Sequence, residues 1–507
     1  MVEGIDGTNP GKNLTKMNPL SKELEFLLKH SSIYGLGNIL SRAVSFLLLP
    51  LYTRYLTLQD YGILELIDVT TSMLGIVIGV GISQAMSQFY HEGSGEKERN
   101  RVVSTIYIII AAISGTSLVL AGTQANLLAE WVLDSSTYGH YFLVAFGSLL
   151  CGIVIDAGQI YLRLLYKSAM YVSISIASLV VGVFLNVLFV VYLDYGVLGV
   201  LYGNLFTKVL LVVPLTGIIM FRVGYSFDWG LAKQMLRYSL FLLPAEITHV
   251  VVNYSDRYFI KHYVSIADAG LYGLANKIGT SIHFLVTSPF IMTFLPRRFE
   301  IAKELNAKQV FCKVFDYYCL LFLSIGLVLS IFVDEIMRVM TTREFYRAGT
   351  LVPLIVLTMF VLGAKYHFEF GILYEKKTQY YSYVNILTAG IHLALNFVLV
   401  RDYGLWGALY ASLIAVFLTT ALVYVVSYRL YPIDFDYGRN LKILAVAALL
   451  YGASVYAPTD IVWIHIIYKL MILSVFPFLL ILVRALSDVE ILKIKQMRLN
   501  VLSWVRM

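Results

Sequence analysis

The sequence is poor in charge and in polar side chains. Only 14% of its 507 residues are Asp, Glu, Lys or Arg, whereas 59% are hydrophobic and the mean hydropathy is +0.75. A water-soluble fold of this length needs many more polar residues to cover its surface. The shortage excludes a series of soluble domains, although the length alone would suggest several.

Cysteine is also rare, and its three occurrences show neither a disulfide framework nor the spacing of a zinc site. Cys151, Cys312 and Cys319 lie in or beside apolar segments, so we expect them to be packing residues. The sequence has no HExxH motif, Walker A motif, nucleophile elbow or Rossmann fingerprint. We therefore expect no metal, no other cofactor and no ATP hydrolysis by this chain.

The formal net charge of +7 does not indicate nucleic-acid binding, because the Lys and Arg residues are scattered along the chain rather than gathered on one face. The first thirty residues are hydrophilic and lack a small-residue cleavage site. We expect no signal peptide to be removed, and the first apolar helix to act as the insertion signal.

Long apolar stretches are what the sequence contains instead. A bilayer core needs about 20 mostly apolar residues per helix, and such stretches recur from residue 31 nearly to the C-terminus. We expect an all-α polytopic membrane protein with about 14 transmembrane helices. The predicted spans are 31–51, 63–82, 102–124, 139–160, 171–192, 197–220, 238–255, 269–294, 314–333, 350–372, 381–400, 405–427, 441–457 and 463–483.

The distribution of basic residues predicts the orientation. With the N-terminus placed in the cytoplasm, most Lys and Arg residues fall on the cytoplasmic side, which predicts that both termini are cytoplasmic. The tail 484–507 suits either a basic amphipathic helix on the inner leaflet or an irregular anchoring segment. Representative residues of the predicted cytoplasmic side are Lys97, Arg99, Arg101, Arg297, Arg298, Lys376 and Lys377.

Separated segments of the sequence repeat at one shift of 208 residues, as a duplicated structural unit would. The clearest match is between YLTLQDYG at 55–62 and YVSIADAG at 263–270. The other matches at this shift are 194–202 with 402–410, Tyr138 with Tyr346, and Tyr166 with Tyr374.

This shift relates the first six predicted helices to the next six. Since six is an even number, both halves enter the membrane in the same direction, as in transporters with parallel repeats. We expect two lobes related by a pseudo-twofold axis along the membrane normal, with a cavity between them; a duplicated scaffold without transport is the alternative. The predicted division is a cytoplasmic tail at 1–30, an N-lobe at 31–221, a C-lobe at 238–427, two further helices at 441–483, and a cytoplasmic tail at 484–507.

Polar residues on the first helix of each lobe follow a spacing of three and four residues, which places them on one helical face. We expect both faces to line the central cavity. Pro244 is expected to break the span 238–255 near its start, as transporter helices often do near a binding site. The two stripes are Gly35, Asn38, Arg42 and Ser45, and Glu246, His249, Asn253 and Asp256.

Basic residues also lie within predicted spans, where each costs about 2.5 to 3.5 kcal/mol on insertion scales. Arg42, Lys208 and Lys277 fall near the middle of their helices, whereas Lys469 lies closer to an end and could reach the interface. Phosphate oxygens accept charge-assisted hydrogen bonds from such cations. The predicted substrate-binding residues are Arg42, Lys208, Lys277, Lys365, Asn38 and Asn253.

Acidic residues within the spans have two interpretations. They could form buried ion pairs with the cations, as Asp68 or Glu65 could with Arg42 or Lys277, or they could carry a coupling proton. The predicted coupling or ion-pair residues are Asp68, Glu65, Asp156, Glu246 and His249.

The sequence resembles the polysaccharide-transporter branch of the multidrug/oligosaccharidyl-lipid/polysaccharide exporter superfamily, the Wzx-type O-antigen flippases. The resemblance rests on PLYTRYLTLQDYGILELI at 50–67 and on SDRYFIKHYVSIADAGLYGLANKIG at 255–279. It also rests on the DYG turns at 194–196 and 402–404, before predicted helices 6 and 12, and on the arrangement of the helices as six, six and two.

This resemblance implies two bundles around a V-shaped cavity, a fold that is also that of MATE transporters. It implies that undecaprenyl-pyrophosphate-linked repeat units are moved to the outer leaflet of a bacterial inner membrane by alternating access. Related lipid II flippases also place an arginine on the first helix, as Arg42 is placed here. The expected partners are the lipid-linked oligosaccharide, membrane lipids and polysaccharide polymerase or ligase machinery, with the chain acting as a monomer.

Two other functions are considered. A cation-coupled multidrug or small-molecule exporter of the same superfamily would have an acidic cavity and usually stops at twelve helices. A membrane polymerase or ligase would need a catalytic external loop, whereas the longest predicted external loop, 334–349, is short. We therefore expect a flippase and not an enzyme.

Overall fold

The computed structural model describes residues 46–79, 81–456 and 462–486, and the elements within these ranges are helices. Among the described helices, ten are long and apolar enough to cross a membrane, or up to eleven if the two halves of a bent helix form one span. The predicted all-helical polytopic fold is confirmed, while the expected number of 14 spans is not.

Three predicted spans account for the difference. The span 31–51 lies largely outside the described residues. The span 269–294 is divided between two short helices by a π-helical turn, and the span 441–457 belongs to a helix whose first turns carry Arg439 and Lys442.

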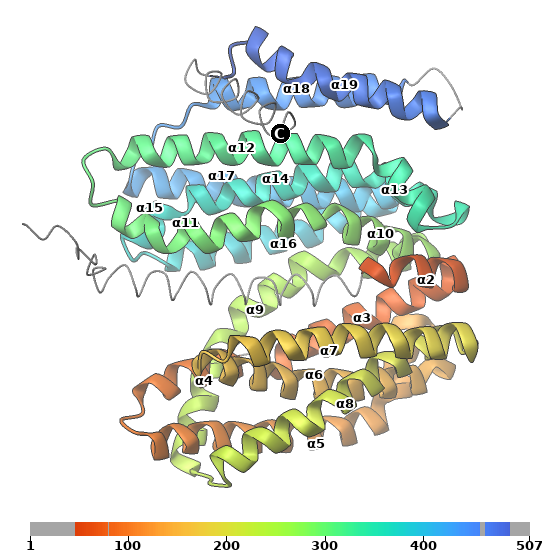
Figure 1. The fold of residues 1–507 in the computed structure, drawn as a ribbon, viewed down its shortest axis with the longest axis vertical. Helices are drawn as coiled ribbons and strands as arrows, with labels where there is room; N and C mark the ends of the chain where they lie inside the picture. The colour runs from red at the N-terminus through yellow and green to blue at the C-terminus, as the bar shows by residue number, and fades with distance from the viewer. Residues whose placement is uncertain (1–45, 80, 457–461, 487–507) are drawn as a thin grey trace, which may run out of the picture.

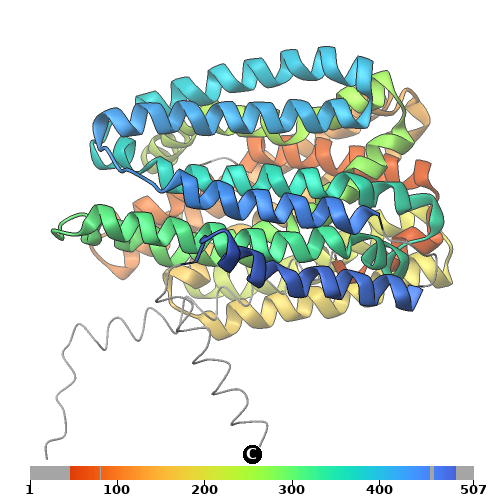
Figure 2. The same ribbon diagram turned by 90° about the horizontal axis from the view of Figure 1, so that it is seen from above.

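The N-lobe forms the lower bundle in Figure 1, coloured red to yellow-green. Most of its helices run nearly parallel to one another in this view, and the C-lobe helices nearest the viewer do so in the view from above (Figure 2). Its elements are α2 (Leu49–Tyr55), α3 (Leu58–Gly79), α4 (Ile82–Glu92), α5 (Glu96–Leu133), η1 (Ser136–Tyr138), α6 (Gly139–Leu164), α7 (Ser168–Asn186), the π-helical η2 (Val187–Tyr192) and α8 (Gly196–Val223).

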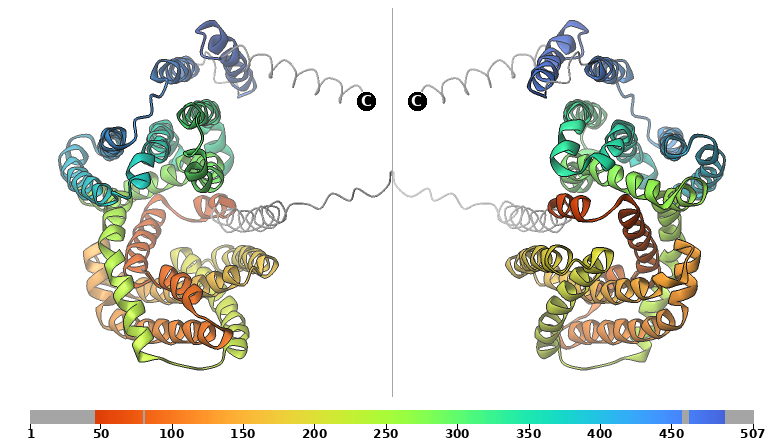
Figure 3. Two further views of the ribbon diagram at one scale, coloured as in Figure 1. Left: turned by 90° about the vertical axis from the view of Figure 1, so that its left-hand side faces the viewer. Right: turned by 90° about the vertical axis from the view of Figure 1, so that its right-hand side faces the viewer.

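The helix α9 (Trp229–Tyr263) crosses from the N-lobe to the C-lobe, which forms the upper bundle in Figure 1. The two C-terminal helices, α18 and α19, lie on the outer side of the C-lobe in both end views, and α18 packs on α12 (Figure 3). The remaining elements are α10 (Ile266–Gly279), the π-helical η3 (His283–Thr287), α11 (Ser288–Ile301), α12 (Ala307–Ile331), α13 (Val333–Met340), η4 (Arg343–Leu351), α14 (Val352–Phe368), α15 (Phe370–Tyr374), α16 (Gln379–Tyr403), α17 (Leu405–Leu430), α18 (Tyr437–Val455) and α19 (Val462–Leu482).

The repeated motif forms the same helix cap in both lobes. At the start of α3, the hydroxyl of Thr57 donates to Asp60 Oδ2 at 2.7 Å, and the amide of Asp60 donates back to Thr57 Oγ1 at 3.1 Å. Ser265 and Asp268 repeat this exchange at the start of α10, with distances of 2.6 Å and 3.0 Å. In both pairs the hydroxyl oxygen of the N-cap residue accepts from an amide of the first helical turn, which would otherwise lack a partner.

One of the predicted repeat matches is displaced by two residues. Tyr166, in the turn after α6, has a left-handed backbone with φ 54°. The residue with the equivalent conformation after α15 is Lys376, with φ 56°, rather than Tyr374. The turn geometry therefore pairs Tyr166 with Lys376.

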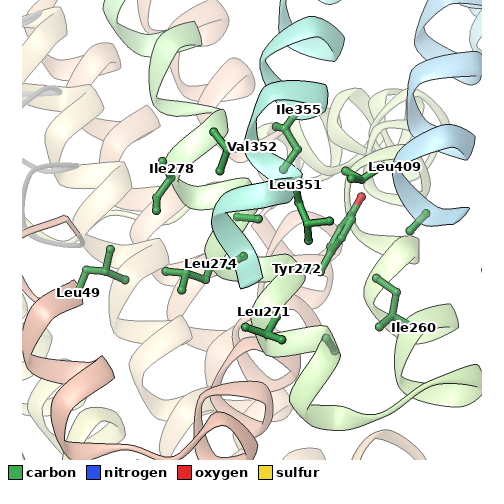
Figure 4. Packing of buried hydrophobic residues seen from close by; sticks show 14 of the residues in the cluster. Leu49, Ile260, Leu271, Tyr272, Leu274, Ile278, Leu351, Val352, Ile355 and Leu409 are labelled. Carbon is green, nitrogen blue, oxygen red and sulfur yellow. The ribbon is translucent and has the colours of Figure 1, made fainter. Parts of the chain in front are cut away.

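The two lobes meet closely at one end of the molecule. There α3 packs on α10, and one hydrophobic cluster contains buried residues of both lobes, such as Leu49 of α2 and Leu274 and Ile278 of α10 (Figure 4). We call this the closed end. The opposite end, which we call the basic end, contains the connections after α4, α6, α8, α11, α15 and α17, and the N-lobe has a separate hydrophobic cluster there.

The expectation that Lys469 of α19 reaches the membrane interface is wrong. Its side chain is 2% exposed, and Nζ lies 2.9 Å from both carboxylate oxygens of Glu335 on α13. The same carboxylate lies 3.3 Å from Nδ1 of His465. A buried ammonium needs a charged partner, and α13 supplies one. This ion pair ties the C-terminal helix to the closed end.

Candidate functional site

The helix α9 is bent by 44° between its halves Trp229–Phe241 and Glu246–Tyr263. Pro244 lies at the break, where it removes a backbone hydrogen-bond donor and its ring crowds the preceding turn. The predicted break at Pro244 is confirmed, although α9 begins earlier than expected, so the break falls near its middle. The first half packs on the N-lobe, with Met235 in its hydrophobic cluster.

A cavity of about 460 Å³ lies between the N-lobe and the second half of α9. Its lining includes Asp156 of α6, Lys208 of α8, and Glu246 and Tyr254 of α9. The lysine ammonium lies close to α6 at Gly152, where an added Cβ would be 3.3 Å from Lys208 Nζ. We call this space the charged cavity. It brings together three residues that the sequence analysis selected from three different helices.

The charged cavity contains charges of both signs. The predicted substrate-binding residues, four of which are cations, would have made it mainly positive. Of the described residues that line it, Asp156 and Glu246 are acidic and Lys208 is basic. The other predicted cations lie elsewhere in the described structure or outside the described residues. The positive character that the sequence predicted for this space is therefore reduced by carboxylates from α6 and α9.

Lys277 interacts electrostatically with Glu65 and Asp68 at the closed end, although neither carboxylate forms a close ion pair with it. Glu65 of α3 forms an ion pair with Arg257 of α9, with 3.4 Å between Oε1 and Nε, and both side chains are mostly buried. The Lys277 ammonium of α10 lies 5.8 Å from the centroid of the Tyr61 ring. Asp68, on the same helix as Glu65, is exposed. The structure thus pairs Glu65 with Arg257, for which the sequence analysis had no role.

Further polar contacts join the lobes at the closed end. The hydroxyls of Thr70 on α3 and Tyr258 on α9 are 2.8 Å apart. Lys261, near the end of α9, forms an ion pair with Asp134, which follows α5. With the Glu65 pair, these contacts link the N-lobe to the second half of α9 at three levels.

Lys365 of α14 does not line the charged cavity. Its ammonium faces the rings of Tyr366 and Tyr381, at 5.5 Å and 5.2 Å from their centroids. On the neighbouring turn, Glu369 lies 3.6 Å from Nη1 of Arg298 on α11. Arg298, expected as a loop charge that sets the topology, is 3% exposed. Its burial beside Glu369 gives it a packing role within the C-lobe.

Asp256 was expected on the cavity-lining stripe of α9, but its carboxylate points into the C-lobe and is buried. Its Oδ2 accepts from Tyr272 Oη at 2.6 Å and from Ser412 Oγ at 2.8 Å. Its Oδ1 accepts from Asn396 Nδ2 at 2.9 Å and lies 3.0 Å from His392 Nε2. The stripe fails here because this turn of α9 packs on α16 and α17.

The sequence analysis missed the Asp256 cluster, although a signal was present. His392 and Asn396 stand one helical turn apart within the predicted span 381–400, and such a polar pair inside a membrane helix usually has a partner. Both side chains are completely buried.

Four further predicted site residues are not among the described residues that line the charged cavity. Asn38 and Arg42 lie outside the described residues, and so does the side chain of His249, whose backbone belongs to α9. Asn253 is exposed on α9, and its carbonyl oxygen accepts a hydrogen bond from Arg257 Nη1 at 2.8 Å. The roles of these residues in binding or coupling stay predictions.

Comparisons with known sequences match a polysaccharide biosynthesis family and bacterial membrane proteins. The family described as polysaccharide biosynthesis protein matches residues 27–302, more than half of the chain. An uncharacterized membrane protein of Haemophilus influenzae is 24% identical over 378 residues, which cover 72% of this chain and 89% of that protein. The EPS I polysaccharide export inner membrane protein EpsE of Ralstonia nicotianae is 27% identical over 168 residues, 32% of this chain and 37% of EpsE.

Solved structures share the fold. The lipid II flippase MurJ in its inward closed conformation matches with a TM-score of 0.70 at 14% identity, covering 90% of this chain and 99% of MurJ. An inward-facing MATE family multidrug resistance transporter of the MOP superfamily matches with a TM-score of 0.63 at 11% identity, covering 76% of this chain and 94% of the transporter. The predicted MATE-like architecture is therefore confirmed.

Proposed function

Because this chain belongs to the polysaccharide biosynthesis protein family, we propose that it is a flippase for a lipid-linked saccharide. Its proposed cargo is an undecaprenyl-pyrophosphate-linked oligosaccharide, an O-antigen or similar repeat unit of a surface polysaccharide. The proposed movement is from the cytoplasmic to the outer leaflet of a bacterial inner membrane, by alternating access. The fold shared with MurJ and the similarity to EpsE support this proposal.

The observation that carries the proposal is the position of Lys208 in the charged cavity. Its half-buried ammonium lies between the N-lobe and the second half of α9, where a headgroup passing between the lobes would meet it. A phosphate oxygen accepts a short, charge-assisted hydrogen bond from such a group. Asp156 and Asp68 are the carboxylates that balance the ammonium, and the diphosphate of the cargo replaces them as its partner.

The contacts between the lobes support a state that admits cargo from the cytoplasm. The positive-inside rule assigns the basic end to the cytoplasm, so the closed end faces the outer side of the membrane. Release would then require the ion pairs of Glu65 with Arg257 and of Asp134 with Lys261 to separate. The proposed partners are the lipid-linked cargo, membrane lipids and the polysaccharide polymerase or ligase machinery, and the proposed working unit is a monomer.

The second candidate is a cation-coupled exporter of small molecules from the same superfamily. The carboxylates of Asp156 and Glu246 in the charged cavity favour it, because they would attract a cationic compound. The two candidates differ in cargo: one carries a phosphorylated lipid, and the other a soluble cation.

Deletion of the gene in a strain without redundant flippases tests the proposal. We expect lipid-linked repeat units to accumulate in the cytoplasmic leaflet, and the plasmid-borne gene to restore the normal distribution. An unchanged distribution between the leaflets contradicts the proposal. If cationic dyes then accumulate in the deletion strain, the exporter is the correct function.

A further inference from the structure

A second cavity adjoins the charged cavity toward the basic end. Its volume is about 850 Å³, and Gln84 of α4 lines both spaces. The other residues used below are Gln88 and Glu92 of α4, Arg163 of α6, Tyr166 of the following turn, and Tyr238 of α9. We call this space the outer groove. Its volume lies within the range of about 300 to 1,000 Å³ that is usual for small-ligand sites.

The side chains of the outer groove differ from those of the charged cavity. They combine carboxamides, phenols, a hydroxyl from Ser87, an imidazole from His91, one carboxylate and one guanidinium, so the groove is polar and carries charges of both signs. Carboxamides donate and accept at the same time, as sugar hydroxyls do. Exposed tyrosine rings offer an apolar face for the C–H groups of a pyranose and a hydroxyl at the edge. This composition suits a saccharide better than a phosphate.

The residues of the outer groove are held in place before any ligand binds. Nε2 of Gln88 donates to Oε1 of Glu92 at 2.7 Å, which fixes two polar groups one helical turn apart. The ring of Tyr238, 37% exposed, packs edge to face on Phe89 with 6.1 Å between the centroids. Such fixed orientation reduces the entropy lost on binding.

A glycine sets the distance between the two helices that form the groove. Gly81, just before α4, has φ 70° and approaches α9 so closely that a Cβ would lie 2.5 Å from Ser239 Cα. Both the left-handed backbone and the close approach require glycine. The contact places α4 beside the first half of α9. Gln88 from α4 and Tyr238 from α9 therefore line the same groove.

We propose that the outer groove is the saccharide subsite for the cargo, with the first sugars bound by Gln88 and Tyr238 while the diphosphate contacts Lys208. This inference rests on the proposed function and extends it. The two spaces adjoin at the shared residue Gln84, so the sugar and the diphosphate of one headgroup can lie in neighbouring sites. The groove recognises the sugar, and the charged cavity recognises the phosphate that all such carriers share.

Binding to the full-length chain in lipid nanodiscs tests this division. The probes are bare undecaprenyl diphosphate and the lipid-linked saccharide extracted from the strain that encodes the chain. The wild type is expected to bind the glycosylated lipid more tightly. Combining Gln88→Ala with Tyr238→Ala is expected to weaken binding of the glycosylated lipid at least tenfold, since the hydrogen bonds of the carboxamide and the contact of the tyrosine ring with the sugar are both lost. Binding of the bare lipid is expected to change less than twofold.

Control variants separate this inference from the proposed function. Gln309→Ala, at an exposed position on α12, is expected to leave both affinities unchanged. Tyr238→Phe keeps the ring and is expected to retain most of the preference for the glycosylated lipid. The subsite is refuted if the double variant keeps the full preference for the glycosylated lipid or loses affinity for both lipids equally. It is also refuted if the wild type binds the two lipids equally well. Failure of the wild type to bind either lipid refutes the proposed function itself.

Discussion

Gly62 and Gly270, which occupy the same place in the two halves of the sequence, touch each other at the closed end. A Cβ on Gly270 would lie 2.7 Å from the backbone nitrogen of Gly62, and a Cβ on Gly62 would lie 2.0 Å from the carbonyl oxygen of Ile266. Equivalent residues of two related units can meet only on the axis that relates them. The pseudo-twofold axis expected from the repeat therefore passes through this contact.

Gly270→Ala is expected to destabilise the closed end by about 1 to 3 kcal/mol, because the methyl group would overlap backbone atoms that cannot move independently. The measurement is thermal unfolding of the purified protein in detergent, together with transport of the cargo. Gly122→Ala serves as the control, since a Cβ there meets nothing within 4 Å. Equal unfolding temperatures for the two variants would show that the lobes do not touch at Gly270.

Arg257→Ala is expected to lower stability by about 3 to 5 kcal/mol, because it leaves the mostly buried carboxylate of Glu65 without its partner. Urea or heat unfolding of the purified variant measures the change. The exchange of both residues, Glu65→Arg with Arg257→Glu, is expected to recover part of the loss. If the exchanged pair is no better than the single variant, the ion pair does not determine the effect.

Lys208→Ala is expected to reduce transport of the lipid-linked cargo at least tenfold, because the charged cavity loses the ammonium proposed to contact the diphosphate. Lys208→Arg keeps the positive charge and is expected to retain more activity than the alanine variant. Lys303→Ala, at an exposed position after α11, is the matched control. Wild-type leaflet distributions in cells carrying Lys208→Ala would remove this residue from the mechanism.

Asp256→Asn is expected to destabilise the C-lobe by about 1 to 3 kcal/mol, because the new carboxamide nitrogen cannot accept from Tyr272, Ser412 or Asn396. Thermal unfolding and transport are measured in parallel. Asp402→Asn, an exposed carboxylate at the end of α16, is the control. Unchanged stability together with lost transport would instead assign Asp256 to the transport cycle.

Lys469→Met alone is expected to weaken the attachment of α19, because Glu335 keeps a buried charge without its main partner. Limited proteolysis and thermal unfolding report the change. Combining Lys469→Met with Glu335→Gln removes both charges and is expected to restore much of the stability. A double variant as unstable as Lys469→Met would contradict this explanation.

The sequence by itself determined the features that depend on near neighbours. Hydropathy located most of the membrane helices, and Pro244 marked the break in α9. Both signals are local, because a span and a proline kink follow from residues within a few turns of one another. The match between 55–62 and 263–270 showed the duplication by direct comparison of the two halves of the sequence.

Only the tertiary structure decided which charged side chains meet. It paired Glu65 with Arg257 and Lys469 with Glu335, and it turned Asp256 away from the cavity toward His392. These choices depend on how each helix is rotated and on which distant helix lies beside it. A helical stripe predicts a face but not its neighbour, so the spacing of polar residues alone could not assign these partners.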